Sequence, residues 1–83
     1  MNSKKIIWSN NARCALKKLD KPIVKRIIDR VERLQLEGFI PSPLVGKFKG
    51  LYKLYAGDWR VLYAFEDDSI VIHDVGHRSD IYK

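Results

Sequence analysis

Hydrophobic residues in the first half of the chain show the pattern of a strand once and the spacing of a helix twice. The β-branched run at 5–8 (Lys-Ile-Ile-Trp) predicts a strand. Apolar residues then recur at i, i+3, i+4 and i+7 over 12–19, and a second helical stripe covers 23–34. Ser9 offers an N-cap oxygen before the first helix, and Gly38 is typical of a helix end. The pattern predicts a strand followed by an antiparallel helix hairpin with one apolar side.

The second half of the chain is predicted to hold a loop and an antiparallel meander. Pro and Gly punctuate residues 39–50, which predicts the loop. Gly57 and Asp58 suit a two-residue hairpin turn, and Asp67-Asp68 suits a second turn. The three strands that these turns join are predicted at 51–56, 59–66 and 70–75. The element order β-α-α-β-β-β predicts a single α+β domain over the whole chain, 1–83.

The turn at Gly57-Asp58 predicts which residues share a face of the first two strands of the meander. With two turn residues, Tyr55 lies opposite Arg60, and Lys53 lies opposite Leu62. We expect the bulkier set to cover the helix hairpin: Tyr52, Leu54, Trp59, Val61, Tyr63 and Phe65. The other set is predicted to form an uncovered face: Leu51, Lys53, Tyr55, Arg60, Leu62 and Ala64. An open face with lysine, arginine and tyrosine at its centre is a candidate site.

Charge favours a polyanionic partner. Sixteen Lys and Arg against ten Asp and Glu give a net charge of +6 and a pI near 9.6. Fourteen of the basic residues and five of the acids lie in residues 1–60, so this part carries +9. On the second helix, four cations are predicted to form a basic ridge that contacts RNA: Lys25, Arg26, Arg30 and Arg33.

Several classes of protein are excluded. A single cysteine, Cys14, allows no internal disulfide, and with two histidines it leaves no metal cluster. No apolar stretch approaches the ~18 residues of a membrane span. The first residues hold no readable secretory signal, so the cytoplasm is the expected compartment. No glycine-rich phosphate loop is present.

Three segments resemble the RelE/ParE superfamily of bacterial and archaeal toxins. They are Phe48–Leu54, Gly57–Tyr63 and Val75–Tyr82, which occur in this order behind the helix hairpin. The resemblance covers nearly the whole chain and implies a RelE-like fold. RelE-type members enter the ribosomal A site and cut the messenger codon held there. The 2′-OH attacks the adjacent phosphorus and leaves a 2′,3′-cyclic phosphate, and no metal or cofactor takes part.

The same resemblance implies roles for individual residues. Arg60 would stabilise charge on the phosphate, since its planar fork can contact two phosphate oxygens. Lys53 would be the base or a second clamp, and Arg78 the acid or a stabiliser of the leaving oxygen. Tyr82 would stack on or orient a base of the codon. Histidine is a common general acid, so His77 is a further candidate, and the identity of the general base and acid stays open.

The chain departs from the family pattern just before the central strand. RelE-type enzymes often carry a second basic residue where Leu51 stands, and Lys47 or Lys49 in the preceding loop would replace its charge. A basic residue is also common where Tyr55 stands. We therefore expect Lys47, Lys49 and Tyr55 to contact RNA.

The resemblance leaves more than one function open. The first is a metal-independent endoribonuclease, an mRNA interferase whose partners are the ribosome and mRNA. The alternative is a ParE-like inhibitor of DNA gyrase that cuts nothing, because one fold hosts both functions. A third is a degenerate, inactive toxin. In each case the implied partner is a cognate antitoxin, RelB-like for the nuclease, and a toxin–antitoxin heterotetramer is one assembly that it allows. No membrane is expected to be involved.

Overall fold

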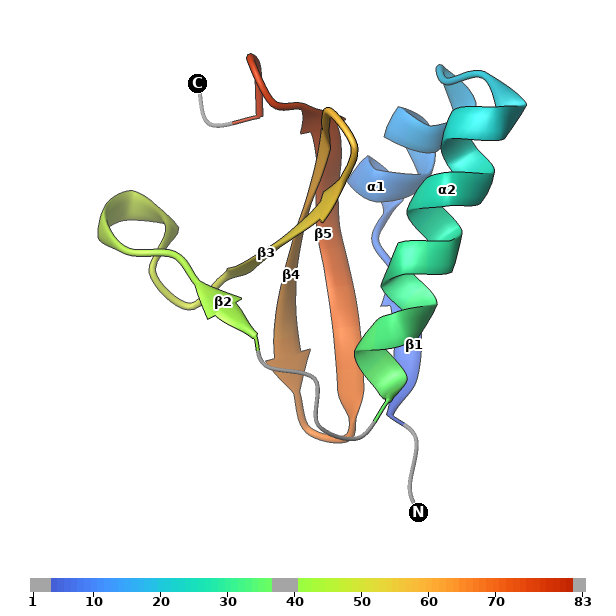
Figure 1. Ribbon diagram of the computed structural model, residues 1–83. Helices are drawn as coiled ribbons and strands as arrows, with labels where there is room; N and C mark the ends of the chain where they lie inside the picture. The colour runs from blue at the N-terminus through green and yellow to red at the C-terminus, as the bar shows by residue number, and fades with distance from the viewer. Residues whose placement is uncertain (1–3, 37–40, 82–83) are drawn as a thin grey trace.

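The computed structural model describes residues 4–36 and 41–81, in which a five-stranded sheet carries two helices on one face (Figure 1). The strand order is β1-β5-β4-β3-β2. The elements in chain order are β1 (Lys5–Trp8), α1 (Asn10–Lys17), α2 (Lys21–Glu32), the 3-10 turn η1 (Arg33–Gln35), β2 (Ser42–Pro43), the 3-10 turn η2 (Gly46–Phe48), β3 (Tyr52–Ala56), β4 (Trp59–Glu66) and β5 (Ser69–His77). This arrangement confirms the predicted α+β class and element order.

The sheet is more extensive than the predicted meander. β1 joins it in parallel beside β5, with Lys5 aligned to Ser69 and Trp8 to Ile72. The predicted loop contains the short strand β2, which pairs antiparallel with β3. β3, β4 and β5 form the predicted meander, and its turns fall at Gly57-Asp58 and at 67–68 as expected. The added strands place β1 and β2 at the two edges of the sheet.

Local sequence explains the helix starts. The Ser9 hydroxyl accepts a hydrogen bond from the Ala12 N–H at 3.1 Å, which satisfies one of the unpaired donors at the start of α1. α2 begins after Asp20, with Pro22 in its first turn, where a missing N–H costs no hydrogen bond. The second helix tightens into η1 before Leu36. The predicted helix end at Gly38 lies outside the described residues.

The core lies between the two helices and the inner face of the sheet, the face that the helices cover. Its largest fully buried side chains are Tyr63, Ile27, Ile70, Ile72, Val31 and Val61. Of the residues predicted to face the helices, Tyr52, Leu54 and Trp59 also pack into or against this cluster. Phe65 remains 37% exposed at the far end of β4 and contacts the Tyr52 and Tyr63 rings edge-on. The predicted inner face is therefore confirmed over most of its length.

The outer face is less open than predicted. Leu62 is only 4% exposed, and Ile81 is 9% exposed. After β5 the chain turns back, which brings Ile81 to this face. Ile81 lies so close to Gly76 that a Cβ atom added to Gly76 would be 3.0 Å from Ile81 Cδ1. Gly76 pairs with Arg60 on β4, so the returning segment covers the outer face near that pair. The prediction of an uncovered face was wrong at Leu62.

A bulge in β5 changes which of its residues face the helices. Leu62 aligns with Asp74 and Tyr63 with Ile72, so the strand carries one extra residue at His73. The Ser9 hydroxyl donates to the freed His73 carbonyl at 3.0 Å. Beyond the bulge the alternation is reversed, so that Val75 enters the core.

Among the described residues, no helix is long and apolar enough to cross a bilayer.

The buried Tyr63 hydroxyl gives the first prediction. It has no hydrogen-bond partner among the described residues, and burial, together with the nearby Tyr52, raises the pKa of Tyr63 from 10.0 to about 12. The folded state therefore favours the neutral phenol. The stabilisation is complete below pH 10 and is lost as the pH rises towards 12, by about 2 to 3 kcal/mol in total.

Urea unfolding of the wild type and of Tyr63→Phe between pH 9 and about 11.5 measures this pH-dependent contribution of Tyr63 to the free energy of unfolding. We expect the difference in free energy of unfolding between the two proteins to change by about 2 kcal/mol across that range. Below pH 10, Tyr63→Phe should be neutral or slightly stabilising, because it removes an unpaired buried hydroxyl. Parallel pH profiles for the two proteins would contradict the assignment.

Candidate active site

Three of the predicted site residues meet at the centre of the outer face. The pairing of β3 with β4 sets Tyr55 opposite Arg60 and Lys53 opposite Leu62, as predicted. The Arg60 guanidinium carbon lies 3.9 Å from the centroid of the Tyr55 ring, and the Lys53 Nζ lies 5.6 Å from the same centroid. Both are within the range of a cation–π contact. The exposed ring therefore gathers two half-buried cations on one surface.

Arg60 is also held by the hairpin turn beside it. Its Nη1 donates to the Gly57 carbonyl at 2.8 Å and to the Trp59 carbonyl at 3.2 Å. Gly57 adopts a φ of +64°, the left-handed region that the first residue of this turn needs and that glycine enters without strain. The turn thus places a carbonyl where the guanidinium can reach it.

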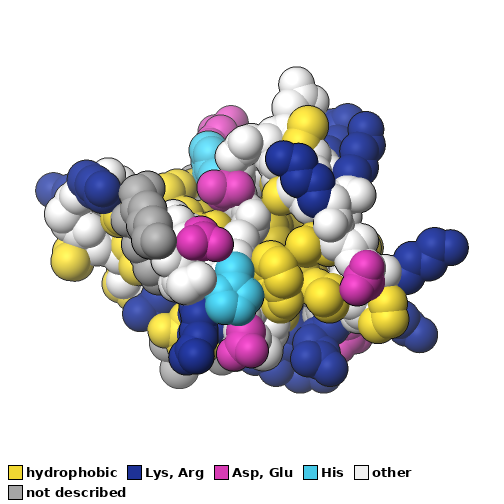
Figure 2. Space-filling view, turned by 90° about the horizontal axis from the view of Figure 1, so that it is seen from above, with side chains coloured by type: hydrophobic (Ala, Val, Ile, Leu, Met, Phe, Trp, Pro, Cys, Tyr) yellow, Lys and Arg dark blue, Asp and Glu magenta, His cyan; other side chains and the backbone are white. Residues whose placement is uncertain are grey.

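Two further arginines reach the same turn from other elements. The Arg78 N–H donates to the Asp58 carbonyl at 2.9 Å, and its Nε lies 3.7 Å from Asp58 Oδ1. From α2, Arg26 Nη1 lies 3.1 Å from where a Cβ of Gly57 would be. Seen from above, Lys and Arg side chains lie around an apolar centre, with Asp and Glu between them (Figure 2). Asp58 is an anion within this basic surface, so a phosphate would compete with it for Arg78.

The structure does not bring His77 together with Arg60 and Lys53. His77 pairs with Trp59, on the helix-facing side of β4, and the two rings meet edge-on at 5.4 Å. Its Nδ1 lies 2.9 Å from Ser79 Oγ and accepts the Ser79 N–H at 3.3 Å. The β5 bulge explains this placement, because it reverses the alternation before His77.

The predicted loop lysines lie on η2 and directly after it. Lys47 is exposed with its Nζ 5.3 Å from the Phe48 ring, and Lys49 is exposed. The loop is tied to β3 because the Leu44 N–H donates to the Leu51 carbonyl at 2.9 Å. Tyr82, expected to contact the codon, lies outside the described residues.

The predicted basic ridge on α2 divides into separate contacts. Arg30 Nε donates to the Tyr55 carbonyl at 3.0 Å, and Arg26 reaches the Gly57 turn. Arg33 instead pairs with Asp29 at 3.5 Å on the exposed side of the helix. Two of the four ridge cations therefore contact the sheet, which helical spacing alone did not indicate.

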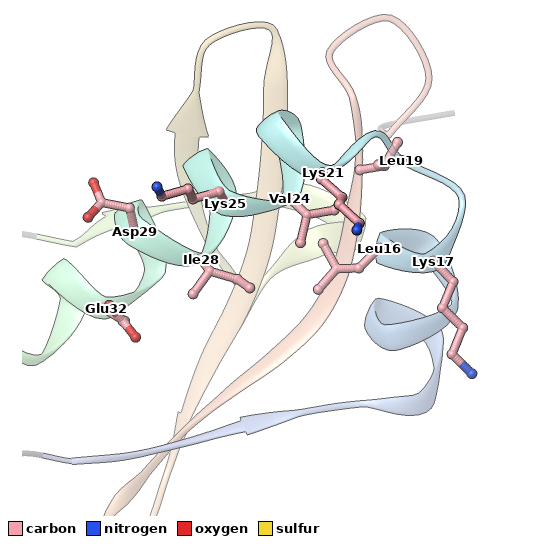
Figure 3. Close-up of a pocket in the computed structure, with 9 residues that line it drawn as sticks. All are labelled: Leu16, Lys17, Leu19, Lys21, Val24, Lys25, Ile28, Asp29 and Glu32. Atoms are coloured by element: carbon pink, nitrogen blue, oxygen red, sulfur yellow. The ribbon is translucent and has the colours of Figure 1, made fainter.

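An apolar groove between α1 and α2 was not anticipated. It has a volume of about 610 Å³. Its walls are largely apolar, and lysine ammonium groups stand at its rim (Figure 3). Its lining residues are Leu16, Lys17, Leu19, Lys21, Val24, Lys25, Ile28, Asp29 and Glu32. In the sequence, the signal for this groove was that Val24 and Ile28 continue the apolar stripe beyond the width that the sheet can cover.

Over residues 4–36 and 41–81, no group of three or more His, Cys, Asp or Glu side chains could hold a metal ion.

Comparisons with known proteins give one matching family model and several similar folds. A model of the ParE toxin of type II toxin–antitoxin systems matches residues 6–82. The RelBE2 toxin–antitoxin complex from Mycobacterium tuberculosis contains a chain 25% identical to this one, with a TM-score of 0.81 over 96% of this chain and 97% of that chain.

Two other complexes contain similar folds. The YoeB–YefM complex from Staphylococcus aureus gives 22% identity and a TM-score of 0.73, covering 92% of this chain and 98% of that chain. The archaeal RelE–RelB complex from Pyrococcus horikoshii gives 23% identity and a TM-score of 0.70, covering 95% of this chain and 99% of that chain. A search of curated proteins found no significant match.

Arg30 on α2 and Arg33 at the start of η1 give the second prediction. Arg30→Gln removes the Nε donor to a β3 carbonyl, so we expect it to lower the free energy of unfolding by about 1 kcal/mol. Arg33→Gln removes only an exposed ion pair and should change it by less than about 0.5 kcal/mol. Urea unfolding of the two variants measures the difference. Equal effects would show that the contact with Tyr55 adds nothing to stability.

Proposed function

This chain belongs to the ParE toxin family of type II toxin–antitoxin systems, and we propose that it is a metal-independent endoribonuclease that cuts the messenger codon in the ribosomal A site. The observation that carries the proposal is the meeting of Lys53, Tyr55 and Arg60 on one outer face of the sheet. The Arg78 backbone is anchored to the adjoining turn. The resemblance to RelE-type toxins supports the same assignment.

The proposed reaction is an internal transfer of the phosphate. The 2′-oxygen of the messenger forms a bond to the adjacent phosphorus while the bond to the 5′-oxygen of the next nucleotide breaks. The proton of the 2′-OH passes to a base, and the leaving 5′-oxygen takes up a proton. Negative charge grows on the non-bridging oxygens, which is where a guanidinium acts most strongly. The products are a 2′,3′-cyclic phosphate and a 5′-OH.

Each cation near the outer face has a proposed role in this step. Arg60 would exchange its bond to the Gly57 carbonyl for the phosphate oxygens. Lys53, two residues from Tyr55 on the same face, would take the base or second-clamp role. Arg78, exposed beside Asp58, would stabilise or protonate the leaving oxygen. Lys47 and Lys49 would contact the RNA backbone from the neighbouring loop, as counterion release favours.

The third prediction tests the role of Arg60. Arg60→Ala should slow cleavage on programmed ribosomes by about 30-fold to 900-fold, which corresponds to about 2 to 4 kcal/mol of transition-state stabilisation. Arg13→Ala is the control, since Arg13 lies on α1 in the helix layer and donates to the Trp8 carbonyl, away from the outer face. Single-turnover cleavage mapped by primer extension measures both.

Two outcomes would count against the proposal. Cleavage by Arg60→Ala within tenfold of the wild-type rate would remove Arg60 from the reaction. Cleavage of free RNA in chelator, without ribosomes, would indicate a different class of nuclease.

One observation, the matched family model, favours a second function. It is a model of the ParE toxin, and the ParE-like alternative is inhibition of DNA gyrase without nuclease activity. A supercoiling assay with purified gyrase separates the two. Inhibition at stoichiometric toxin, with no cleavage on ribosomes, would favour the alternative.

We also propose an antitoxin as the partner of the α1–α2 groove. The three similar structures are complexes of a toxin with an antitoxin. Here the groove has apolar walls from Leu16, Val24 and Ile28, and lysines stand at its rim. An amphipathic helix with acidic flanks would bury its apolar side and pair with those lysines. We extend this proposal to a toxin–antitoxin heterotetramer in the cytoplasm.

The fourth prediction tests the groove. Changing Lys17, Lys21 and Lys25 to Glu should weaken antitoxin binding by more than tenfold at low salt, and the loss should shrink as salt screens the charges. Changing Lys47 and Lys49 to Glu is the control on the opposite side of the molecule. Calorimetry with the purified antitoxin measures both. Unchanged affinity in the groove variant, with hydrogen-exchange protection only over 51–64, would place the antitoxin on the sheet instead.

A further inference from the structure

We propose that Tyr55 is a positioning residue whose ring holds the Arg60 guanidinium and the Lys53 ammonium in place on the outer face. The effect on rate rests on the proposed function. The geometric part concerns the protein alone and can be tested without substrate.

The contacts of the Tyr55 ring show why it can act in this way. Arg60 and Tyr55 are directly opposed across β3 and β4, so their side chains leave the sheet side by side. The Arg60 guanidinium carbon at 3.9 Å from the ring centroid is in van der Waals contact with the ring face. Lys53 shares that face two residues earlier on β3, and its Nζ lies 5.6 Å from the same centroid. One ring thus contacts two of the three cations to which the proposed reaction gives a role.

Tyr55 is itself fixed from the far side of the sheet. Its carbonyl accepts the Arg30 Nε–H at 3.0 Å, which ties this part of β3 to α2. The adjacent Leu54 and Ala56 are buried at 6% and 2% exposure, so the backbone on either side is packed into the core. The ring remains 45% exposed but projects from a backbone that cannot shift without disturbing that packing. The ring therefore projects from a fixed point of the sheet, where it can hold the cations that rest on it.

The ring counters two effects that would scatter these cations. Lys53 and Arg60 carry like charges, so they repel one another, and each has a long side chain with several rotamers. A cation–π contact at an exposed site is sufficient to favour the held rotamer by about two- to fivefold. The contact of Arg60 with the Gly57 carbonyl selects the same placement of the guanidinium. Removing the ring should release both cations together.

A base-stacking role for Tyr55 predicts a different result. If the ring stacked on a messenger base, its loss would weaken binding of the ribosome-bound substrate in every background. If the ring acts through Arg60, its loss lowers the rate constant at saturating ribosome and leaves affinity unchanged. The loss should also be smaller when Arg60 is already absent, because only the contact of the ring with Lys53 then remains. These two patterns separate a positioning residue from an RNA contact.

The experiment compares Tyr55→Leu with Tyr55→Phe, which keeps the aromatic face, and uses Phe65→Leu as the matched control. Phe65 is likewise an exposed aromatic residue with a lysine nearby, Lys4 at 6.0 Å, but it lies on the other face of the sheet. In the free protein, the Arg60 guanidinium protons should show an upfield ring-current shift by NMR. That shift should persist in Tyr55→Phe and Phe65→Leu and vanish in Tyr55→Leu.

In the cleavage assay, Tyr55→Leu should lower the single-turnover rate at saturating ribosome by about fivefold, and Tyr55→Phe should restore most of that loss. Added to Arg60→Ala, Tyr55→Leu should lower the rate by a smaller factor than it does alone, because only the contact with Lys53 remains to be lost. An Arg60 shift unchanged in Tyr55→Leu, or a loss of equal size in both backgrounds, would overturn the inference. If the wild type cuts nothing, the proposed function fails, and the NMR comparison alone decides whether Tyr55 holds Arg60.

Discussion

The two-residue turn at Gly57 and Asp58 sets the register of β3 against β4, and the placement of the outer-face cations follows from that register. Gly57 adopts a φ of +64°, which a side-chain-bearing residue would enter only with strain. The short turn leaves one alignment in which Leu54 meets Val61 inside and Tyr55 meets Arg60 outside. A slip of one residue would place Arg60 in the core, so the apolar packing of the inner face also enforces the site.

The same turn is the meeting point of elements far apart in the chain. Arg26 from α2 lies over Gly57, Arg60 from β4 bonds to its carbonyl, and Arg78 after β5 bonds to Asp58. A turn exposes carbonyl groups that no strand uses, and these groups offer acceptors to nearby guanidinium groups. Positive charge therefore concentrates at one end of the sheet, where polar backbone groups partly balance it.

The helices support the two candidate surfaces in separate ways. The side of α2 that faces β3 supplies Arg30, which anchors the strand bearing Tyr55. The side that faces α1 supplies Val24 and Ile28 to an apolar groove with lysines at its rim. One helix thus connects a surface that suits a partner protein with the strand that carries the candidate active site. The groove and the outer face are on opposite sides of the sheet, so a partner could occupy one without covering the other.

The sequence by itself determined the order of the elements, the helix-facing residues and the β3–β4 register, because turn chemistry and side-chain alternation are local. Lys53, Tyr55 and Arg60 could be placed together on that basis alone. The tertiary structure decided what depends on contacts distant in sequence. The bulge at His73 carries His77 to the helix-facing side, and no local pattern marks a bulge that the end of β1 and the start of α1 help to stabilise.

The burial of Leu62 and Ile81, the parallel pairing of β1 with β5 and the division of the α2 ridge are likewise tertiary. The exposed side of a helix and the open face of a strand have the same polar pattern whether or not another segment comes to rest on them. Periodicity identifies the face that must be buried in the core. Only the folded chain decides which of the remaining side chains find a neighbour, because the free energy of those contacts depends on segments that meet after the core has formed.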